Sequence, residues 1–423
     1  MNTRGIGPTR RMSMSPQSCD ILAYEAGMSL DFRQVQKQVT ELGENARQRE
    51  ERLNDRRERA KNLLATHAQE LDVLRQKVER VVSGYDATLR CALPVTEPLN
   101  AALPFPAQSG AGTILAADGS QINPNRNVEV NYGLVNAGAI VMKRGSTDAP
   151  ETHITSQLYY EEDLNTATGT ITEDVLALRR DLNERAILLK LALTAQAPVI
   201  TFTDGPMELW GAKDAAGEGA AEYKNSLEDY RNVLKQLCQM GVITAGYVDK
   251  PGADLVVRLL EVASAHDTEL PGIRTHRPLR GCRDIDLYRG ILQPGDRSAV
   301  FQMQSKSMEN YPGELAIHFF YLNVGRKDHS KIARVEIPAW VAQNPEMVDN
   351  LHATLVSQCR IMGSRSYPYL LHRAHETAVV TLQDQEQVTH MILMELRRRG
   401  VGVGETSEKQ AAKDLSGRKS YGI

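Results

Sequence analysis

The chain of 423 residues contains little cysteine, few aromatic residues and no long apolar run. Its cysteines are scattered and form no CxxC pair, which argues against a disulfide framework and against a structural zinc site. Aromatic residues make up 5% of the chain, so the core must rely mainly on Leu, Ile, Val, Ala and Met. No segment approaches the roughly 18 uninterrupted apolar residues of a membrane span. The cysteines are Cys19, Cys91, Cys238, Cys282 and Cys359.

The chain also lacks a dominant charge and a phosphate-binding GxxxxGK(S/T) loop. Its 50 basic and 53 acidic residues give a net charge of −3, so any nucleic-acid-binding surface has to be local. Without the phosphate loop, the chain is not expected to hydrolyse ATP. The first twenty residues carry Arg4, Arg10 and Arg11 but no apolar segment of a signal peptide. We therefore expect a cytoplasmic protein.

The segment from Asp31 to Val82 is highly charged and free of proline. Apolar residues recur in it at steps of three and four, which predicts helix with one apolar stripe. Arginines interrupt this stripe around Arg49 and Arg56. The pattern fits one long helix, a broken helical hairpin or, less well, a partial coiled coil. The charge run Arg47–Arg59 is more typical of a solvated face with helical ion pairs than of DNA contact.

After a Pro/Ala/Gly-rich stretch, apolar strand patterns alternate with helical patterns. Early strands are expected at residues 113–117, 128–132 and 135–142, and later ones at 198–203, 242–248, 299–303, 315–323 and 331–337. Helices are expected at residues 173–195, 223–240, 254–265, 345–361 and 385–399. This alternation predicts an α/β fold with a mixed central sheet flanked by helices.

These patterns also predict a domain layout. We expect a disordered tail over residues 1–30, a helical arm over 31–93, a linker over 94–112, a catalytic domain over 113–399 and a flexible tail over 400–423.

Two segments share one plan, in which an apolar strand runs into Asp-Gly. They are Ile114–Ser120, which contains Asp118, and Val199–Pro206, which contains Asp204. A carboxylate at the carboxyl end of a buried strand is held rigidly at the sheet rim, and the glycine lets the backbone turn away. Two such carboxylates on adjacent strands can share Mg²⁺ or Mn²⁺, as metal-assisted phosphodiester hydrolysis requires. The alternative is that each Asp-Gly is an ordinary turn.

Further candidates lie in the helix before the second of these strands and near the C-terminus. Glu184 lies near the apolar face of its helix and can complete a metal shell, whereas Glu173, in the first turn, is also explained by the helix dipole. His372 and His375 are spaced for one helical face and can bind a metal or transfer a proton. The residue patterns alone leave the choice between the two histidines open.

Four short motifs in this order resemble the NurA nuclease family. They are Asp118-Gly-Ser, Asp204-Gly-Pro, Gly246-Tyr-Val-Asp-Lys-Pro251 and Tyr367-Pro-Tyr-Leu-Leu-His-Arg-Ala-His375. The resemblance covers about residues 112–393. It implies an RNase H-like core and Mn²⁺-dependent nuclease action, with single-strand endonuclease and 5′-to-3′ exonuclease activities. It also implies a homodimer that works with the hexameric ATPase HerA, a translocase, in DNA end resection and repair.

The resemblance also assigns roles to individual residues. Asp118 and Asp204 match the metal-binding aspartates of the family, His375 matches its C-terminal active-site histidine, and Glu184 matches the acidic residue between them. Tyr321 matches an aromatic residue near the site. Pro206 replaces the hydroxyl residue that follows the second Asp-Gly in the family, which puts the local backbone geometry in doubt.

Basic residues in the catalytic domain are candidates for contacts with the DNA backbone. The densest basic loop runs from Arg274 to Arg283, and phosphate contacts require only suitably placed cations. The DNA-binding candidates are Lys250, Arg274, Arg277, Arg280 and Arg283, with Tyr321 added from the resemblance.

Two other functions fit the same sequence. The chain can be a non-catalytic scaffold for a HerA-type ATPase, with the helical arm as its binding element. It can also be an RNase H-like phosphatase that acts on small phosphoesters. Loss of DNA cleavage with retained partner binding in Asp118→Ala separates the nuclease from the scaffold.

Overall fold

The computed structural model describes residues 30–107, 110–125, 128–166, 169–210, 218–327 and 329–401. The predicted tails therefore lie almost entirely outside the described residues. The chain divides into two compact units, Met1–Asn54 and Asp55–Ile423. The predicted domain boundaries remain predictions.

The first unit, as far as it is described, is helical. Helix α1 (Phe32–Glu44) begins where the Asp31 carboxylate accepts hydrogen bonds from the backbone N–H groups of Arg33 and Gln34. Its apolar stripe, which includes Phe32 and Leu42, is exposed. Helix α2 (Ala46–Thr66) starts in this unit, where Arg47 and Glu51 form the expected i,i+4 ion pair at 3.0 Å.

The second unit contains one large sheet and the helices around it. Its strands are β1 (Cys91–Pro94), β2 (Gly112–Ile122), β3 (Tyr132–Arg144), β4 (Glu151–Tyr160), β7 (Val199–Asp204), β8 (Ile243–Val248), β9 (Phe301–Gln304), β10 (Ile317–Asn323) and β11 (Ile332–Pro338), with a separate pair, β5 (Asn165–Thr166) and β6 (Gly169–Thr170). Its helices after α2 are α3 (Leu71–Gly84), α4 (Glu173–Ala192), α5 (Glu218–Gln239), α6 (Leu255–Ser264), α7 (Asp284–Tyr288), α8 (Ala339–Ala342), α9 (Pro345–Ile361), α10 (Tyr369–Ala378) and α11 (Leu382–Arg398). Short 3-10 helices are η1 (Glu161–Leu164), η2 (Asp267–Gly272), η3 (Lys306–Asn310) and η4 (Gly313–Leu315).

The large sheet has nine strands in the order β1-β9-β10-β11-β8-β7-β2-β3-β4. Strands β2, β3 and β4 are antiparallel neighbours, and β7 and β8 run parallel to β2 on its other side. Three antiparallel strands followed by two strands parallel to the first form the strand order of an RNase H-like core. The predicted α/β fold with this core is confirmed. Strands β11, β10, β9 and β1 extend the sheet beyond β8 in antiparallel fashion.

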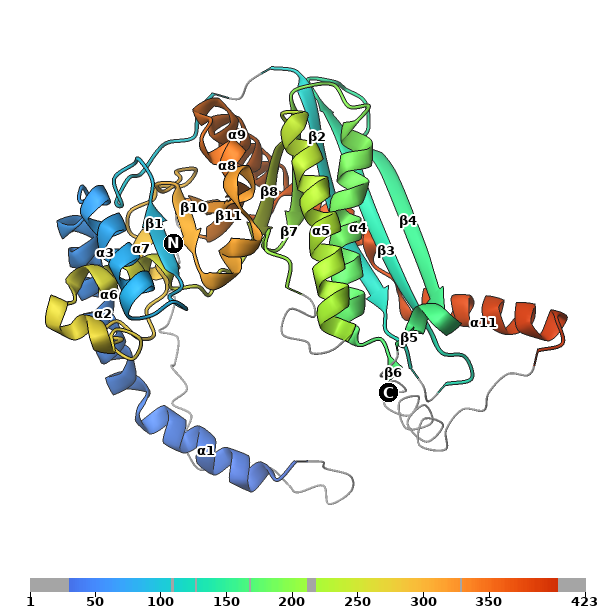
Figure 1. The fold of residues 1–423 in the computed structure, drawn as a ribbon, viewed down its shortest axis with the longest axis horizontal. Coiled ribbons are helices and arrows are strands. Elements are labelled where there is room, and N and C mark those ends of the chain that lie inside the picture. The colour runs from blue at the N-terminus through green and yellow to red at the C-terminus, as the bar shows by residue number, and fades with distance from the viewer. Residues whose placement is uncertain are drawn as a thin grey trace, which may run out of the picture. The chain divides into compact units, whose positions relative to one another are not determined.

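Helices cover both faces of the core strands. Helices α4 and α5 pack on each other, and α4 packs on β2 and β3, as Figure 1 shows. Helix α10 packs on the same two strands from the opposite face. On that face, Phe202, Tyr247 and Phe320 of the sheet join Leu351 and Leu355 of α9 in one buried apolar cluster. Burial of each such side chain stabilises the fold by roughly 1.5–3 kcal/mol.

The structure corrects several element predictions. In place of the two strands predicted at residues 128–132 and 135–142, the structure has one strand, β3, from Tyr132 to Arg144. Residues 128–131 form no strand. The edge strands β1 and β4 and the helix α10 were not predicted. Most β4 side chains are exposed, so the strand shows little apolar alternation. No described helix combines the length and apolar character needed to cross a membrane.

Candidate active site

Asp118 and Asp204 lie at the same edge of the sheet. Asp204 is the last residue of β7, as predicted, and Gly205 follows with a φ of 89°, a conformation that glycine adopts without strain. Asp118 differs from the prediction because β2 does not end there but continues to Ile122, paired with β3. The parallel pairing of β2 with β7, however, ends at Ala117 and Thr203.

The two aspartates therefore follow directly after a pair of in-register residues on adjacent strands. Strands lie about 5 Å apart, and alternate residues of a strand point to the same face. Asp118 points to the same face of the sheet as Ile114 and Ala116, because it lies an even number of residues after them. Asp204 shares a face with Phe202 for the same reason. Ile114, Ala116 and Phe202 belong to the buried cluster beneath α9 and α10. Both carboxylates consequently emerge on the α10 side of the sheet edge.

Helix α10 and the residues before it supply partners for both aspartates. The His375 Nδ1 lies 2.7 Å from Asp118 Oδ2, and the Gly119 N–H donates to Asp118 Oδ1 at 2.8 Å. The side chain of His375 is 62% exposed, whereas that of Asp118 is 16% exposed. His372 instead faces Glu376, at 3.5 Å. Geometry therefore separates the two candidate histidines, since only His375 contacts an aspartate of the site.

Tyr367 fixes the second aspartate. Its hydroxyl donates a hydrogen bond to the Asp204 carboxylate, and its ring packs edge-on against Tyr247 with centroids 5.7 Å apart. Burial and the charges of Asp204 and Asp118 raise the pKa of the Tyr367 hydroxyl, so it remains a proton donor at neutral pH.

Helix α4 brings further charged groups from the opposite face of the sheet. Glu184 is buried and forms an ion pair at 3.7 Å with Arg180, which also pairs with Asp181 at 2.8 Å. Helix α4 approaches β2 closely at Gly119, where a Cβ atom would lie 2.5 Å from Arg180 Cγ and 2.7 Å from Glu184 Oε1. Only glycine fits there, and its absence of a side chain brings Glu184 next to Asp118.

The electrostatics show an excess of negative charge at this edge. Burial, together with repulsion from Asp181 and Asp118, raises the pKa of Glu184 well above its ordinary value, although Arg180 opposes the shift. Burial and the charge of Asp118 also raise the pKa of Asp204, while the hydrogen bond from Tyr367 lowers it. A carboxylate group whose members repel one another is stabilised by a bound cation.

A cavity of about 310 Å³ unites these groups. The four carboxylates named above, Asp118, Asp181, Glu184 and Asp204, all line it. Pro206, Leu209 and Trp210 give it an apolar side, and the Trp210 indole is 45% exposed with the Arg90 guanidinium 5.8 Å from its ring centre.

The chemistry of these donors fits a hard divalent cation. Asp118, Asp204 and Glu184 offer only oxygen ligands, which Mg²⁺ and Mn²⁺ prefer. Among the described residues, however, no group of three or more His, Cys, Asp and Glu side chains is arranged to hold a metal ion. In this arrangement Arg180 neutralises part of the charge, since it pairs with both Asp181 and Glu184.

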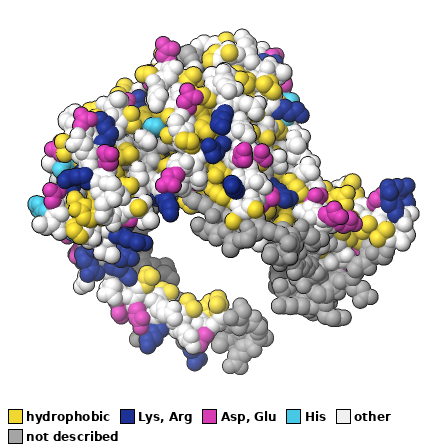
Figure 2. All heavy atoms as spheres, viewed as in Figure 1, with side chains coloured by type: hydrophobic (Ala, Val, Ile, Leu, Met, Phe, Trp, Pro, Cys, Tyr) yellow, Lys and Arg dark blue, Asp and Glu magenta, His cyan; other side chains and the backbone are white. Residues whose placement is uncertain are grey.

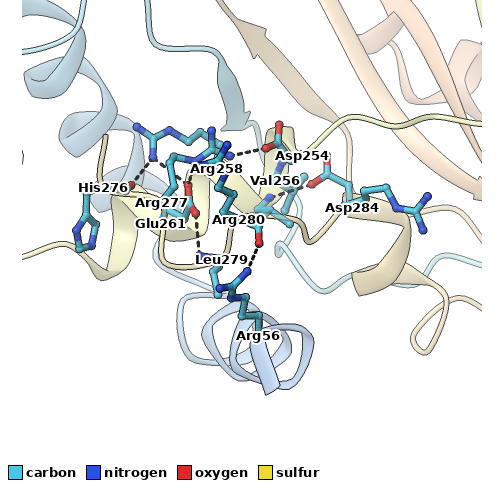
Figure 3. Close-up of polar contacts among 12 residues, drawn as sticks. Arg56, Asp254, Val256, Arg258, Glu261, His276, Arg277, Leu279, Arg280 and Asp284 are labelled. Carbon is cyan, nitrogen blue, oxygen red and sulfur yellow. Dashed lines mark hydrogen bonds and ion pairs between the residues drawn. The ribbon is translucent and has the colours of Figure 1, made fainter. Parts of the chain in front are cut away.

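The predicted DNA-binding arginines lie in a tightly held loop, shown in Figure 3. The fully buried Glu261 of α6 accepts hydrogen bonds from Arg258 Nη1 at 2.9 Å, Arg277 Nε at 2.6 Å and the backbone N–H of Leu279 at 2.9 Å. Arg277 also pairs with Asp254. Arg277 is thus engaged in holding the fold. Lys250, Arg274 and Arg280 are exposed.

Arg283 and Tyr321 differ in how well they suit DNA contact. Arg283 is exposed and lies 3.3 Å from Asp286. Tyr321 is fully buried in β10, where its hydroxyl donates to Asp284 at 2.5 Å and its ring stacks on Tyr288. A direct contact of Tyr321 with DNA is therefore wrong for this structure, because the apolar pattern of its strand places it in the core.

Several residues near the site were not among the predicted site residues. They include Asp181, Tyr367 and Asp249, the last of which follows β8 and contributes to the raised pKa of Asp204. Tyr367 and Asp249 lie within the motifs that carry the family resemblance, so the motifs contained a signal for them. Asp181 lies on an ordinary helical surface pattern and gives no such signal.

A family model and several solved structures match the chain. The NurA domain family matches residues 112–380. No curated protein matches the chain. The NurA nuclease from Sulfolobus solfataricus, a crystal structure, is 13% identical, with 87% of this chain and 98% of that chain covered at a TM-score of 0.44.

Two other solved structures show weaker likeness. The catalytic domain of human Endonuclease V is 13% identical, with 77% of this chain and 98% of that chain covered at a TM-score of 0.30. A type 1 RNase H with the type 2 active-site motif is 14% identical, with 36% of this chain and 69% of that chain covered at a TM-score of 0.21. At such scores the fold assignment rests on the strand order itself.

Proposed function

This chain belongs to the NurA family, and we propose that it is a metal-dependent deoxyribonuclease. The observation that carries the proposal is the meeting of Asp118, Asp204 and Glu184, from three separate elements, around one cavity. The proposed activities are single-strand endonuclease and 5′-to-3′ exonuclease cleavage. The solved NurA structure is itself described as that of a nuclease.

The three carboxylates would hold Mn²⁺ or Mg²⁺. Bound there, the ion would supply positive charge for a phosphodiester and for the groups that react with it. Burial raises the pKa values of Glu184 and Asp204, and repulsion from neighbouring carboxylates raises them further. A bound cation would relieve this repulsion, which supports the proposed role. Tyr367 holds Asp204 in position through its hydroxyl and is a positioning residue.

His375 has the exposure and the partner of a proton-transfer group. Its Nδ1 faces Asp118, which orients the imidazole and leaves Nε2 for the substrate or for water. From this position it would bind a phosphate oxygen when protonated, or accept a proton when neutral.

The cavity also favours a nucleic acid over a small phosphoester. The Trp210 indole lines the cavity with the carboxylates and is partly exposed, and bases stack on aromatic rings regardless of their sequence. A small phosphate ester without an aromatic group could not stack on this side chain. Figure 2 shows basic and acidic side chains interspersed over most of the displayed face, so DNA contacts would have to be local.

The proposed partners are DNA, a second copy of the chain in a homodimer and a HerA-type hexameric ATPase. The absence of a GxxxxGK(S/T) loop from the sequence supports the last, since processive feeding of DNA would need an external motor. DNA repair by end processing and defence against foreign DNA would use the same chemistry.

The proposal is tested by degradation of labelled single- and double-stranded DNA with Mn²⁺, Mg²⁺ or a chelator. Parent protein should cut with a divalent ion and stop with the chelator, and Asp118→Ala and Asp204→Ala should not cut. Asp229→Asn, an exposed aspartate of α5, is the matched control and should cut normally. Cutting that persists in both purified aspartate variants would eliminate the mechanism. Failure with every metal, in the presence of a cognate ATPase, would favour the scaffold function.

A further inference from the structure

A second cavity, of about 570 Å³, lies at the same edge of the sheet as the carboxylates. Asp249 and Lys250, which directly follow β8, form one side of it, and Lys331, directly before β11, forms another. Strands β8 and β11 are antiparallel neighbours, with Val248 opposite Arg334. These segments therefore come together at the end of β8, next to the end of β7 that carries Asp204.

The lining of this cavity is strongly basic. Lys250, Arg283, Arg289 and Lys331 contribute four cations, whereas Asp249 is the one carboxylate among the described lining residues. Arg283 and Arg289 flank the short helix α7, which forms the third side. A surface concentration of one charge sign in a concave site attracts ions of the other sign.

Two of the four cations are held by the protein and two are available. Lys331 Nζ pairs with Asp249 at 2.8 Å and donates to the Ser366 carbonyl at 2.9 Å, and Arg283 pairs with Asp286. Within the described part of the chain, the exposed side chains of Lys250 and Arg289 make no ion pair. These two side chains are therefore available to bind an anion in the cavity.

The cavity is physically linked to the candidate active site. Lys331 contacts the carbonyl of Ser366, and the next residue, Tyr367, donates its hydroxyl to Asp204. Val335 of β11 is level with Asp204 of β7, since both pair with Tyr247 of β8, and Lys331 lies four residues before Val335. Two strand spacings and four residues along the strand place the Cα atoms of Asp204 and Lys331 roughly 16 Å apart. Along a stacked strand of DNA, where phosphates rise by about 3.4 Å each, this distance is on the order of five nucleotides.

We propose that this cavity, lined by Lys250 and Arg289, binds a phosphate group of the DNA strand whose scissile bond lies at Asp118 and Asp204. The inference rests on the proposed nuclease function and adds a phosphate subsite to it. The carboxylate cavity repels a polyanion, so a neighbouring basic cavity offsets that repulsion and fixes the register of the strand. The bound phosphate is either internal to the strand or the terminal phosphate of a 5′ end.

The test is DNA binding by the full chain in EDTA, measured by fluorescence anisotropy at several salt concentrations. The probes are matched single-stranded oligonucleotides with a 5′-phosphate or a 5′-hydroxyl. Lys250→Gln combined with Arg289→Gln should weaken binding by roughly ten-fold and reduce the salt slope by about 0.7 for each lost contact. Lys235→Gln, an exposed lysine of α5, is the matched control and should leave both quantities unchanged. Circular dichroism establishes that each variant is folded.

The two probes distinguish the two kinds of phosphate. A loss confined to the 5′-phosphorylated probe assigns the cavity to the terminal phosphate, and an equal loss on both probes assigns it to an internal phosphate. An affinity and salt slope equal to those of the parent, in a folded double variant, overturn the inference.

The binding test is also independent of the nuclease test. If the chain cuts DNA but the double variant binds normally, only the phosphate subsite fails. If the chain never cuts DNA but the double variant binds more weakly, the basic cavity stands as a nucleic-acid site and the nuclease proposal fails.

Discussion

The imidazole Nδ1 of His375 lies 2.7 Å from the carboxylate of Asp118, although 257 residues separate the two in sequence. The contact joins α10 to β2 at the point where the pairing of β2 with β7 has just ended. It orients the histidine and leaves its second ring nitrogen free of Asp118.

Substitution of His375 by alanine should reduce DNA cleavage by roughly a hundred-fold to ten-thousand-fold, the usual contribution of a proton-transfer group. Binding of DNA in a chelator should change little, because the phosphate-binding cations remain. The measurement is single-turnover cleavage with saturating Mn²⁺. His372→Ala, one helical turn earlier and directed at Glu376, should retain activity within about three-fold. Equal losses in the two variants would remove the special role of His375.

Tyr367→Phe tests the positioning of Asp204. The variant removes the hydroxyl that donates to the carboxylate but keeps the ring against Tyr247. Loss of such an outer partner typically costs ten-fold to a hundred-fold in metal affinity or activity. We expect a higher Mn²⁺ concentration for half-maximal cleavage and an unchanged melting temperature. Tyr369→Phe is the control, and an identical Mn²⁺ dependence in both variants would contradict the prediction.

Glu261→Gln should destabilise the protein by roughly 3 kcal/mol, the order of loss when a buried ion pair is deprived of one charge. The fully buried carboxylate holds Arg258, Arg277 and the backbone of Leu279, so the loop that follows α6 should also exchange its amide hydrogens faster. Urea unfolding and hydrogen exchange measure the two effects. Glu309→Gln, at an exposed position, should change neither, and a stable Glu261→Gln variant would show that the network does not support the loop.

His352 provides a prediction of pH dependence. Burial lowers the pKa of its imidazole from 6.5 to about 4, although the hydrogen bond to the Gly295 carbonyl opposes the shift. Between these two values the unfolded chain binds a proton that the folded chain does not. The free energy of unfolding should therefore fall as the pH decreases from 6.5 towards 4, by up to roughly 3 kcal/mol from this residue.

The measurement is urea unfolding at a series of pH values. His352→Gln should flatten the dependence over this window, whereas His390→Gln, an exposed histidine of α11, should not alter it. A parent-like slope in His352→Gln would mean that other groups account for the acid sensitivity.

Much of the core could be predicted from the sequence because its strands are apolar and its helices are periodic. Strands β7 to β11 and helices α4, α5, α6 and α9 follow these patterns closely. Strand β4 could not be predicted in this way, since it is an edge strand with mostly exposed side chains. The strand order was equally inaccessible to local patterns, because pairing of β2 with β7 depends on contacts between distant segments.

Site residues could be predicted where a sequence motif marks the end of a strand. Site residues on a helix were harder to distinguish from other charged residues of that helix. Asp204 at the end of β7 follows the expected plan, whereas β2 continues past Asp118. Asp181 lies on α4 among other charged residues, and its sequence pattern does not show that it lines the cavity. Tyr321 was predicted to contact DNA, but its side chain is fully buried and packs in the core.

The order of the candidate site residues along the chain determines when the site can be completed during synthesis. Asp118, Glu184 and Asp204 leave the ribosome well before α10, which carries His375. A nascent or truncated chain that ends before Tyr369 possesses the three acidic groups without the histidine and without the helix that covers that face of β2 and β3. On the proposed function, DNA cleavage would then be withheld until α10 has been synthesised.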